Sequence, residues 1–234
     1  MPLRFIAPLL NPDIEPEVAA NGDLELAEAN HRIANSLALV SGLLRSQASA
    51  AVRERRSFSS AEVSGLLLEA AVRIETVGRL HGRLARADAG LGLSELVREV
   101  AESIVDSLAG PTLARLTLQL DPCCVAPPRS GLPIALAVGE LVTNSLKYAH
   151  PTGVPVEIGV VCGADAAGAL LIEVSDDGVG LPEGFDPMTS DGFGLRLLRT
   201  LAEQMGATLT FEAPGIGLIV RLQFPPAKPR PVDA

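Results

Sequence analysis

The chain has 234 residues, of which 47% are hydrophobic but only 3% aromatic, which predicts one large or two small globular domains with aliphatic cores. Its formal net charge of −9 argues against sequence-independent nucleic-acid binding, because such binding depends on cations that neutralise phosphates. No apolar run reaches the roughly 18 residues of a membrane span, and the N-terminus lacks a signal-peptide pattern. The 3 cysteines fit neither a zinc site nor a disulfide framework, so we expect free thiols and a cytoplasmic location.

Residues 1–22 form an N-terminal extension that is too short for a sensor domain. Residues 23–89 then carry two helical patterns in which apolar residues recur at alternating steps of four and three, and they predict a helical hairpin. The first seam includes Leu26, Ile33, Leu37, Val40 and Leu44, and the second includes Val63, Leu67, Ile74 and Val77. One hairpin cannot enclose two long apolar seams, so we expect a homodimer in which two hairpins form a four-helix bundle.

His31 lies on the face of the first predicted helix that is turned away from the apolar seam. Glu28 precedes it by three residues and therefore shares that face. We expect an exposed imidazole that a second molecule or domain can reach, with a carboxylate beside it.

Residues 90–224 differ in pattern, and the glycines near residue 90 mark the domain boundary. The order of predicted helices and strands gives an α+β fold, in which helices cover one face of a mostly antiparallel sheet. Helices are predicted at 93–108, through 140–150 and from 194 to about 205; strands are predicted at 114–120, 154–162, 169–175, 208–212 and 217–224. The Pro-rich residues 225–234 are an expected disordered tail.

Polar residues gather on one face of the predicted helix at 140–150. A period of 3.6 residues places Glu140 and Asn144 in line, followed by Lys147 and Tyr148. The opposite face, which includes Ser145, is the one expected to pack on a core. Asn144 offers a neutral oxygen to a hard cation such as Mg²⁺, and Lys147 offers a positive charge to phosphate. Alone, the pattern is equally typical of any amphipathic helix.

Two glycine motifs follow this helix. Asp176-x-Gly178-x-Gly180 comes at a strand end, where a carboxylate can accept a hydrogen bond from an exocyclic amine and backbone can approach a flat ligand. Gly192-x-Gly194 precedes a helix, whose free N–H groups attract phosphate. Ordinary turns would explain either motif alone. The ordered set of polar helix and two glycine motifs indicates a nucleotide site.

These motifs resemble those of histidine kinases. Residues 140–150 resemble the N box of the Bergerat ATPase fold shared with gyrase and Hsp90-type ATPases, and residues 176–180 and 192–195 resemble its G1 and G2 boxes. The sequence HRIANSL at residues 31–37 is similar to the phosphoacceptor box of a subgroup that includes the HWE-type enzymes. The resemblance covers about residues 23–224, with the motifs in the family order.

The resemblance implies an α/β-sandwich ATPase domain that binds ATP and Mg²⁺. His31 would receive the phosphoryl group and pass it to an aspartate of a response-regulator receiver domain. Asn144 would bind Mg²⁺, Lys147 would contact phosphate and Asp176 would bind adenine. The remaining expected nucleotide-binding residues lie in the same boxes and are Tyr148, Gly178, Gly180, Gly192, Gly194 and Leu195.

The chain departs from the family pattern in three ways. Arg32 stands where conventional histidine kinases have an acidic residue, so we expect Glu28 or Glu140 to act as the base or orienting group. The absence of Trp excludes the tryptophan-containing HWE signature and favours the related non-HWE branch. The third departure is that the chain shows no sensory domain. A separate sensor protein would then supply the signal, or the chain is a kinase core cut from a longer one.

Two other functions stay open from the sequence. A histidine phosphotransferase relay would share the architecture without productive ATP binding, and the short loop at 181–191 is compatible with it. The N, G1 and G2 boxes favour the kinase, because a relay does not need Asn144 or Asp176. A serine kinase of the anti-sigma type would share the ATPase domain but would not need the His31 hairpin.

Overall fold

The structure is a computed structural model that describes residues 92–225, except 110–111, 128–129, 151–152, 166–167 and 191, together with isolated positions between 34 and 78. These isolated positions are helical apart from Ser59, as the predicted hairpin requires. His31 and Glu28 lie outside the described residues, so the phosphoacceptor box and the four-helix bundle stay predictions. Within the described part of the chain, no helix has the length and apolarity needed to cross a membrane.

The helices and strands of the described domain match the predicted ones closely. For the helix at 93–108 and the five strands, the predicted bounds agree with the observed ones to within two residues, whereas the helix predicted through 140–150 begins earlier, at Gly131. In chain order, the elements are α3 (Leu93–Leu108), β1 (Ala114–Leu120), α4 (Gly131–Tyr148), β2 (Val156–Ala164), β3 (Leu170–Asp176), α5 (Phe193–Met205), β4 (Thr208–Glu212) and β5 (Leu218–Gln223).

The strands form one five-stranded mixed sheet in the order β1-β2-β3-β5-β4. The predicted hairpins β2–β3 and β4–β5 are confirmed as antiparallel pairs, and β3–β5 is antiparallel too. β1 pairs with β2 in parallel, because α4 carries the chain back across the sheet between them. Asp176 ends the central strand β3 and pairs with both Ile158 and Leu218. This end of the sheet is where the predicted site residues meet.

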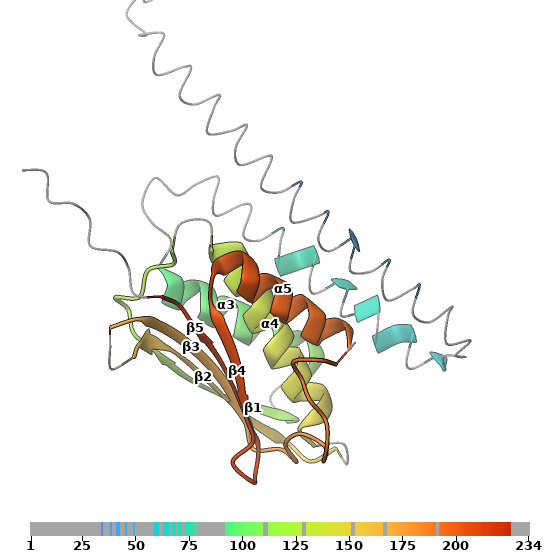
Figure 1. Cartoon of the computed structure of the whole chain (residues 1–234). Coiled ribbons are helices and arrows are strands. Elements are labelled where there is room, and N and C mark those ends of the chain that lie inside the picture. The colour runs from blue at the N-terminus through green and yellow to red at the C-terminus, as the bar shows by residue number, and fades with distance from the viewer. Residues whose placement is uncertain are drawn as a thin grey trace, which may run out of the picture.

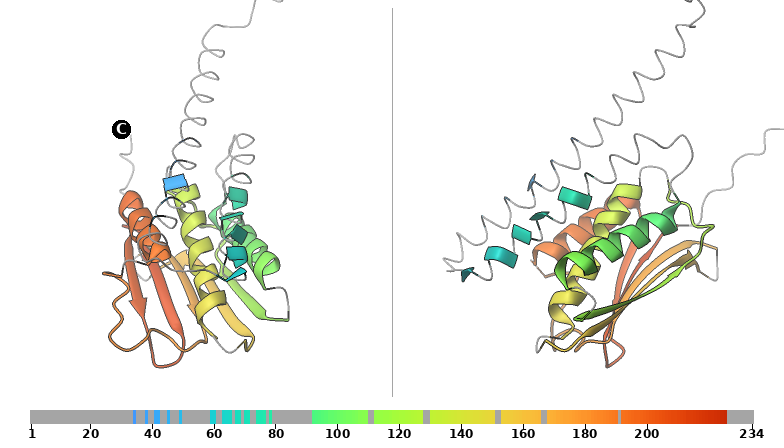
Figure 2. Two further views of the ribbon diagram at one scale, coloured as in Figure 1. Left: turned by 90° about the vertical axis from the view of Figure 1, so that its right-hand side faces the viewer. Right: turned by 180° about the vertical axis from the view of Figure 1, so that it is seen from behind.

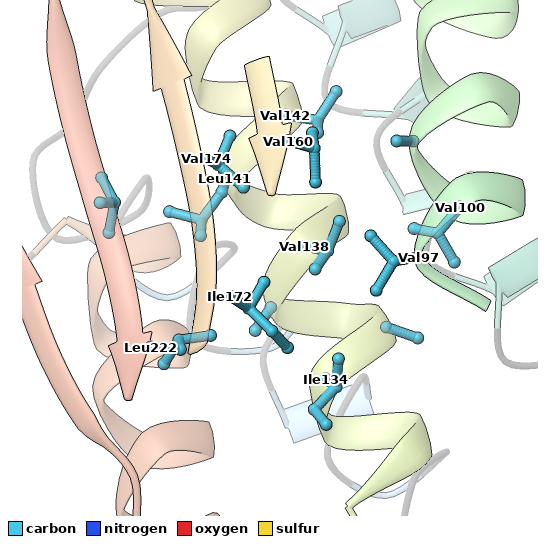
Figure 3. Close-up of a cluster of buried hydrophobic side chains, with 14 of the residues drawn as sticks. Val97, Val100, Ile134, Val138, Leu141, Val142, Val160, Ile172, Val174 and Leu222 are labelled. Carbon is cyan, nitrogen blue, oxygen red and sulfur yellow. The ribbon is translucent and has the colours of Figure 1, made fainter. Parts of the chain in front are cut away.

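The helices α3, α4 and α5 lie on one face of the sheet, as Figures 1 and 2 show. α4 lies between α3 and α5 and is buried along most of its length. Figure 3 shows its apolar side chains filling the space between α3 and the strands. The labelled residues of this core are Val97, Val100, Ile134, Val138, Leu141, Val142, Val160, Ile172, Val174 and Leu222. The aliphatic core expected from the composition is therefore confirmed.

Candidate nucleotide-binding site

A cavity of about 600 Å³ opens between α4, the end of the sheet, the loop after β3 and the start of α5. Apolar side chains such as Leu141, Val174 and Val220 line part of it, which suits a flat ring system. The predicted site residues that line the cavity are Glu140, Asn144, Lys147, Tyr148, Asp176, Gly180, Gly192, Gly194 and Leu195. The fold therefore brings the three boxes together in one place.

The Asp176 carboxylate is fixed in the cavity by two hydrogen bonds. The hydroxyl of Ser145 donates to Oδ2 across 2.9 Å, and the amide of Gly178 donates to Oδ1 across 3.0 Å. An ionised carboxylate has about four acceptor sites, so capacity remains for a ligand amine. Ser145 is buried, as its predicted core face requires, but its hydroxyl reaches Asp176 and links α4 to β3. Sequence reasoning missed this role.

The polar face of α4 differs from the predicted one at its first residue. Lys147 and Tyr148 are exposed and Asn144 is half-buried, but Glu140 has only 5% of its surface accessible. Glu140 is covered because the start of α5 lies against it. A Cβ built on Gly194 would lie 2.1 Å from Oε1 of Glu140, so any other residue would require the Glu140 side chain to move. The second G2 glycine thus makes room for a buried carboxylate beside the N-terminus of α5.

Gly178, predicted to let backbone approach a ligand, does not itself line the cavity but packs against the end of α4. A Cβ on Gly178 would lie 2.3 Å from Cα of Ala149 at the end of α4. Backbone bonds hold the loop on both sides: Val179 N–H donates to the Ala149 carbonyl at 2.9 Å, and Gly217 N–H donates to the Gly178 carbonyl at 2.6 Å. Gly178 therefore fixes the loop against α4, while Gly180, with a φ of 72°, reaches the cavity.

Asp177 forms a second link between the loop and its surroundings. Its Oδ1 lies 2.9 Å from Nε2 of His150 and accepts a hydrogen bond from the Glu157 amide at 2.9 Å. Partial burial acts to raise the pKa of Asp177, but the bonds from Glu157 and His150 and the charge of His150 outweigh it and lower that pKa. Sequence reasoning missed this pair, although the two adjacent aspartates were a visible signal.

The oxygen donors of the cavity fit a magnesium ion that is bound together with phosphate. No group of three or more His, Cys, Asp or Glu side chains that could hold a metal occurs among the described residues. The Asn144 amide lines the cavity with Glu140, and Lys147 lies at the same wall. Mg²⁺ commonly takes few protein ligands and completes its shell with phosphate oxygens and water. Asn144 is therefore the residue that would hold it.

A three-helix layer over a mixed sheet, with a cavity that joins an acidic strand end to a glycine-capped helix, defines a nucleotide-binding domain. The family "Histidine kinase-, DNA gyrase B-, and HSP90-like ATPase" matches residues 130–228, and the family "Histidine kinase" matches residues 28–108. The chain belongs to the histidine kinases and carries their ATPase fold.

Relatives agree with this assignment. The Blue-light-activated histidine kinase 2 of Erythrobacter litoralis is 27% identical over 215 residues, which are 90% of this chain and 59% of that protein. The Sensor histidine kinase PdtaS of Mycobacterium tuberculosis is 29% identical over 206 residues, which are 87% of this chain and 40% of the relative. This chain thus spans about half the length of these relatives.

Among solved structures, the histidine kinase domain of the Erythrobacter litoralis blue-light-activated histidine kinase is similar. It superposes with a TM-score of 0.64 at 27% identity, covering 90% of this chain and 94% of that domain. This match extends well beyond the ATPase domain alone. The assignment to the non-HWE branch stays a prediction.

Proposed function

We propose that this chain is an ATP-dependent protein-histidine kinase of a two-component system. One observation carries the proposal: Asp176, Asn144, Lys147 and Gly194 come from three separate sequence motifs and line one cavity. The fold therefore supplies, in one place, an acceptor for a base amine, an oxygen for Mg²⁺ and a cation for phosphate.

The proposed roles follow the geometry of the cavity. Asp176, held by Ser145, would accept a hydrogen bond from the exocyclic amine of adenine. Asn144 would hold Mg²⁺, which neutralises phosphate charge when it is bound, and Lys147 would contact the phosphates. The start of α5 at Gly192 and Gly194 would face the phosphates, because free N–H groups at a helix N-terminus attract anions.

In the proposed reaction, a ring nitrogen of His31 attacks the γ-phosphorus, the bond from that phosphorus to the β–γ bridging oxygen breaks, and ADP leaves. The phosphoryl group then passes to an aspartate of a response-regulator receiver domain. One of two carboxylates would accept the imidazole proton or orient the ring. They are Glu28, which shares a predicted helix face with His31, and Glu140, which would reach His31 from the ATPase domain. Replacing each by Gln tests this role, and full phosphotransfer in both variants would overturn it.

We further propose a homodimer. Val63, Leu67 and Ile74, three members of the second predicted seam, are 41%, 66% and 50% exposed in the single chain. Their exposure supports the expectation that a second copy covers the seam. A monomer in light scattering at micromolar concentration would contradict it. A separate sensor protein remains a proposed partner, and consumption of ATP favours the cytoplasm as the compartment.

The test is incubation of the purified chain with γ-labelled ATP and Mg²⁺, beside the His31→Ala variant. We expect label that is acid-labile and base-stable, and we expect none in the variant. Asn144→Ala should lose the label as well, although its His31 is intact. If the wild-type chain takes no label from ATP but takes it from a phosphorylated receiver domain in a His31-dependent way, the protein is a relay.

A further inference from the structure

Residues 181–190, here called the lid, follow the G1 loop and form one wall of the cavity. Leu181, Pro182, Phe185 and Ser190 line the cavity from this segment. In many nucleotide sites such a wall forms only when ligand arrives, and ordering it then costs affinity. The contacts of this lid show that it is folded and held against α5.

Part of this order comes from Asp186 within the lid. Its Oδ1 accepts a hydrogen bond from the Met188 amide at 2.8 Å, and its Oδ2 accepts one from the Thr189 hydroxyl at 3.0 Å. Its backbone carbonyl accepts from the Ser190 amide at 3.0 Å. The second half of the lid is thus a capped turn around one carboxylate.

A side chain from outside the lid holds this turn in place. Arg199 lies on α5, and its Nη1 donates to the Pro187 carbonyl while its Nη2 donates to the Ser190 carbonyl, each at 2.7 Å. Both carbonyls belong to the turn, Pro187 near its start and Ser190 at its end. The planar guanidinium matches such a pair because its donors are fixed relative to one another. Bonds from an ionised donor are also stronger than neutral ones.

We propose that Arg199 is a positioning residue for the nucleotide: it holds the lid folded against α5 before the nucleotide binds. The inference rests on the proposed function and deepens it. Arg199 does not line the cavity, but Ser190, which it holds, does. Gly192 caps the start of the same helix, and Gly194 lies in its first turn. The guanidinium therefore holds the lid at a fixed position relative to the proposed phosphate-binding end of the site.

Loss of the two hydrogen bonds from the Arg199 guanidinium should first loosen the lid and thereby weaken ATP binding. In Arg199→Ala, both carbonyls turn to water and the lid samples open forms, so ATP must order it again. Loss of a charge-assisted hydrogen bond corresponds to about a tenfold change in an equilibrium constant. Arg199→Lys keeps the charge, but its single ammonium group cannot reproduce the paired hydrogen bonds of the planar guanidinium. Its effect on the lid and on ATP affinity should therefore be intermediate.

The experiment compares the 234-residue chain with Arg199→Ala, Arg199→Lys and a matched control, Arg98→Ala. Arg98 is an exposed arginine of α3 that forms an ion pair with Glu102 across 3.6 Å. Hydrogen exchange of the lid peptide is measured without nucleotide, and chymotrypsin cleavage after Phe185 and Met188 gives a second readout. The dissociation constant for ATP with Mg²⁺ is measured on the same samples.

We expect lid exchange and the ATP dissociation constant to rise together by about tenfold in Arg199→Ala, less in Arg199→Lys and not in Arg98→Ala. A lid that exchanges at the wild-type rate in Arg199→Ala would overturn the inference, and so would a loosened lid with unchanged ATP affinity. If Arg199→Ala fails to fold, Arg199→Lys decides: wild-type exchange and affinity in that variant would overturn the inference. A wild-type chain that binds no ATP would instead overturn the proposed function. Hydrogen exchange of the lid would then still test whether Arg199 keeps the lid folded.

Discussion

Ser145 and Asp176 lie in different secondary-structure elements, 31 residues apart in sequence, and are joined by a hydrogen bond of 2.9 Å. The serine is buried within α4, one residue after Asn144. The carboxylate ends β3 and faces the cavity. The same turn of helix thus presents an amide to the proposed metal–phosphate group and a hydroxyl to the proposed base-binding carboxylate.

Ser145→Ala should weaken ATP binding, because Asp176 would lose the donor that fixes one of its oxygens. A hydrogen bond to a charged group contributes about 1.5–3 kcal/mol, so we expect affinity to fall by about tenfold or more. Titration calorimetry with ATP and Mg²⁺ measures the effect. Ser175→Ala is the matched control, because Ser175 lies beside Gly159 on the neighbouring strand and does not line the cavity. Equal affinity in the two variants would contradict the assigned role of Ser145.

Gly178→Ala should destabilise the domain, because the added methyl group would meet backbone atoms of Ala149 that cannot move aside. Forcing extra volume into a packed site costs about 1–3 kcal/mol. Gly163→Ala is the control, since a Cβ there would have no heavy atom within 4 Å apart from those of the adjacent residues in the chain. Denaturant unfolding should show a loss of stability for the first variant and a change within about 0.5 kcal/mol for the second. Similar stabilities for both would show that the loop can shift away from α4.

The sequence predicted the elements of the ATPase domain well, because their periods are clear. α3 and β1 begin and end at the predicted residues, Leu93–Leu108 and Ala114–Leu120. The two hairpins were predictable because glycine-containing turns separate β-branched runs. The parallel pairing of β1 with β2 was not, since it is decided by the path of α4 over the sheet and not by any local pattern.

The site was predictable as a set of motifs but not as contacts. Helical periodicity assigned Glu140 to a polar outer face, yet a second helix covers it, and only the tertiary structure places Gly194 against its carboxylate. Gly178 was expected at the ligand because glycine motifs commonly approach ligands, whereas here the close approach is to Ala149. Arg199 gave no signal, since its partners are backbone carbonyls.

Stability at acid pH should depend on Asp177. The pKa of Asp177 is lower in the folded chain, so the group adds stability above the ordinary aspartate pKa of about 3.9, and this stability is lost as the pH falls through the lowered value. Because 44% of the side chain is exposed, solvent screens the effect, which should stay below about 1 kcal/mol. The difference in unfolding free energy between wild type and Asp177→Asn should therefore shrink as the pH falls below about 4. A difference that is constant down to acid pH would contradict this linkage.

The thiols should differ sharply in reactivity. Burial, together with the neighbouring thiol of Cys124, raises the pKa of Cys162 to about 12, and burial is also the main cause that raises the pKa of Cys124. Only the thiolate reacts with alkylating agents, so Cys162 should react far more slowly at pH 8 than a thiol of ordinary pKa. Cys123 is exposed on the turn after β1. Iodoacetamide at pH 8 should therefore modify Cys123 in the folded chain and all 3 cysteines only after unfolding, as peptide mass spectrometry can establish.

Cys123→Ser should abolish the fast modification without changing ATP affinity, because this residue does not line the cavity. Rapid modification of Cys162 in the folded chain would show that β2 separates from its neighbours and that the core around this thiol opens to solvent.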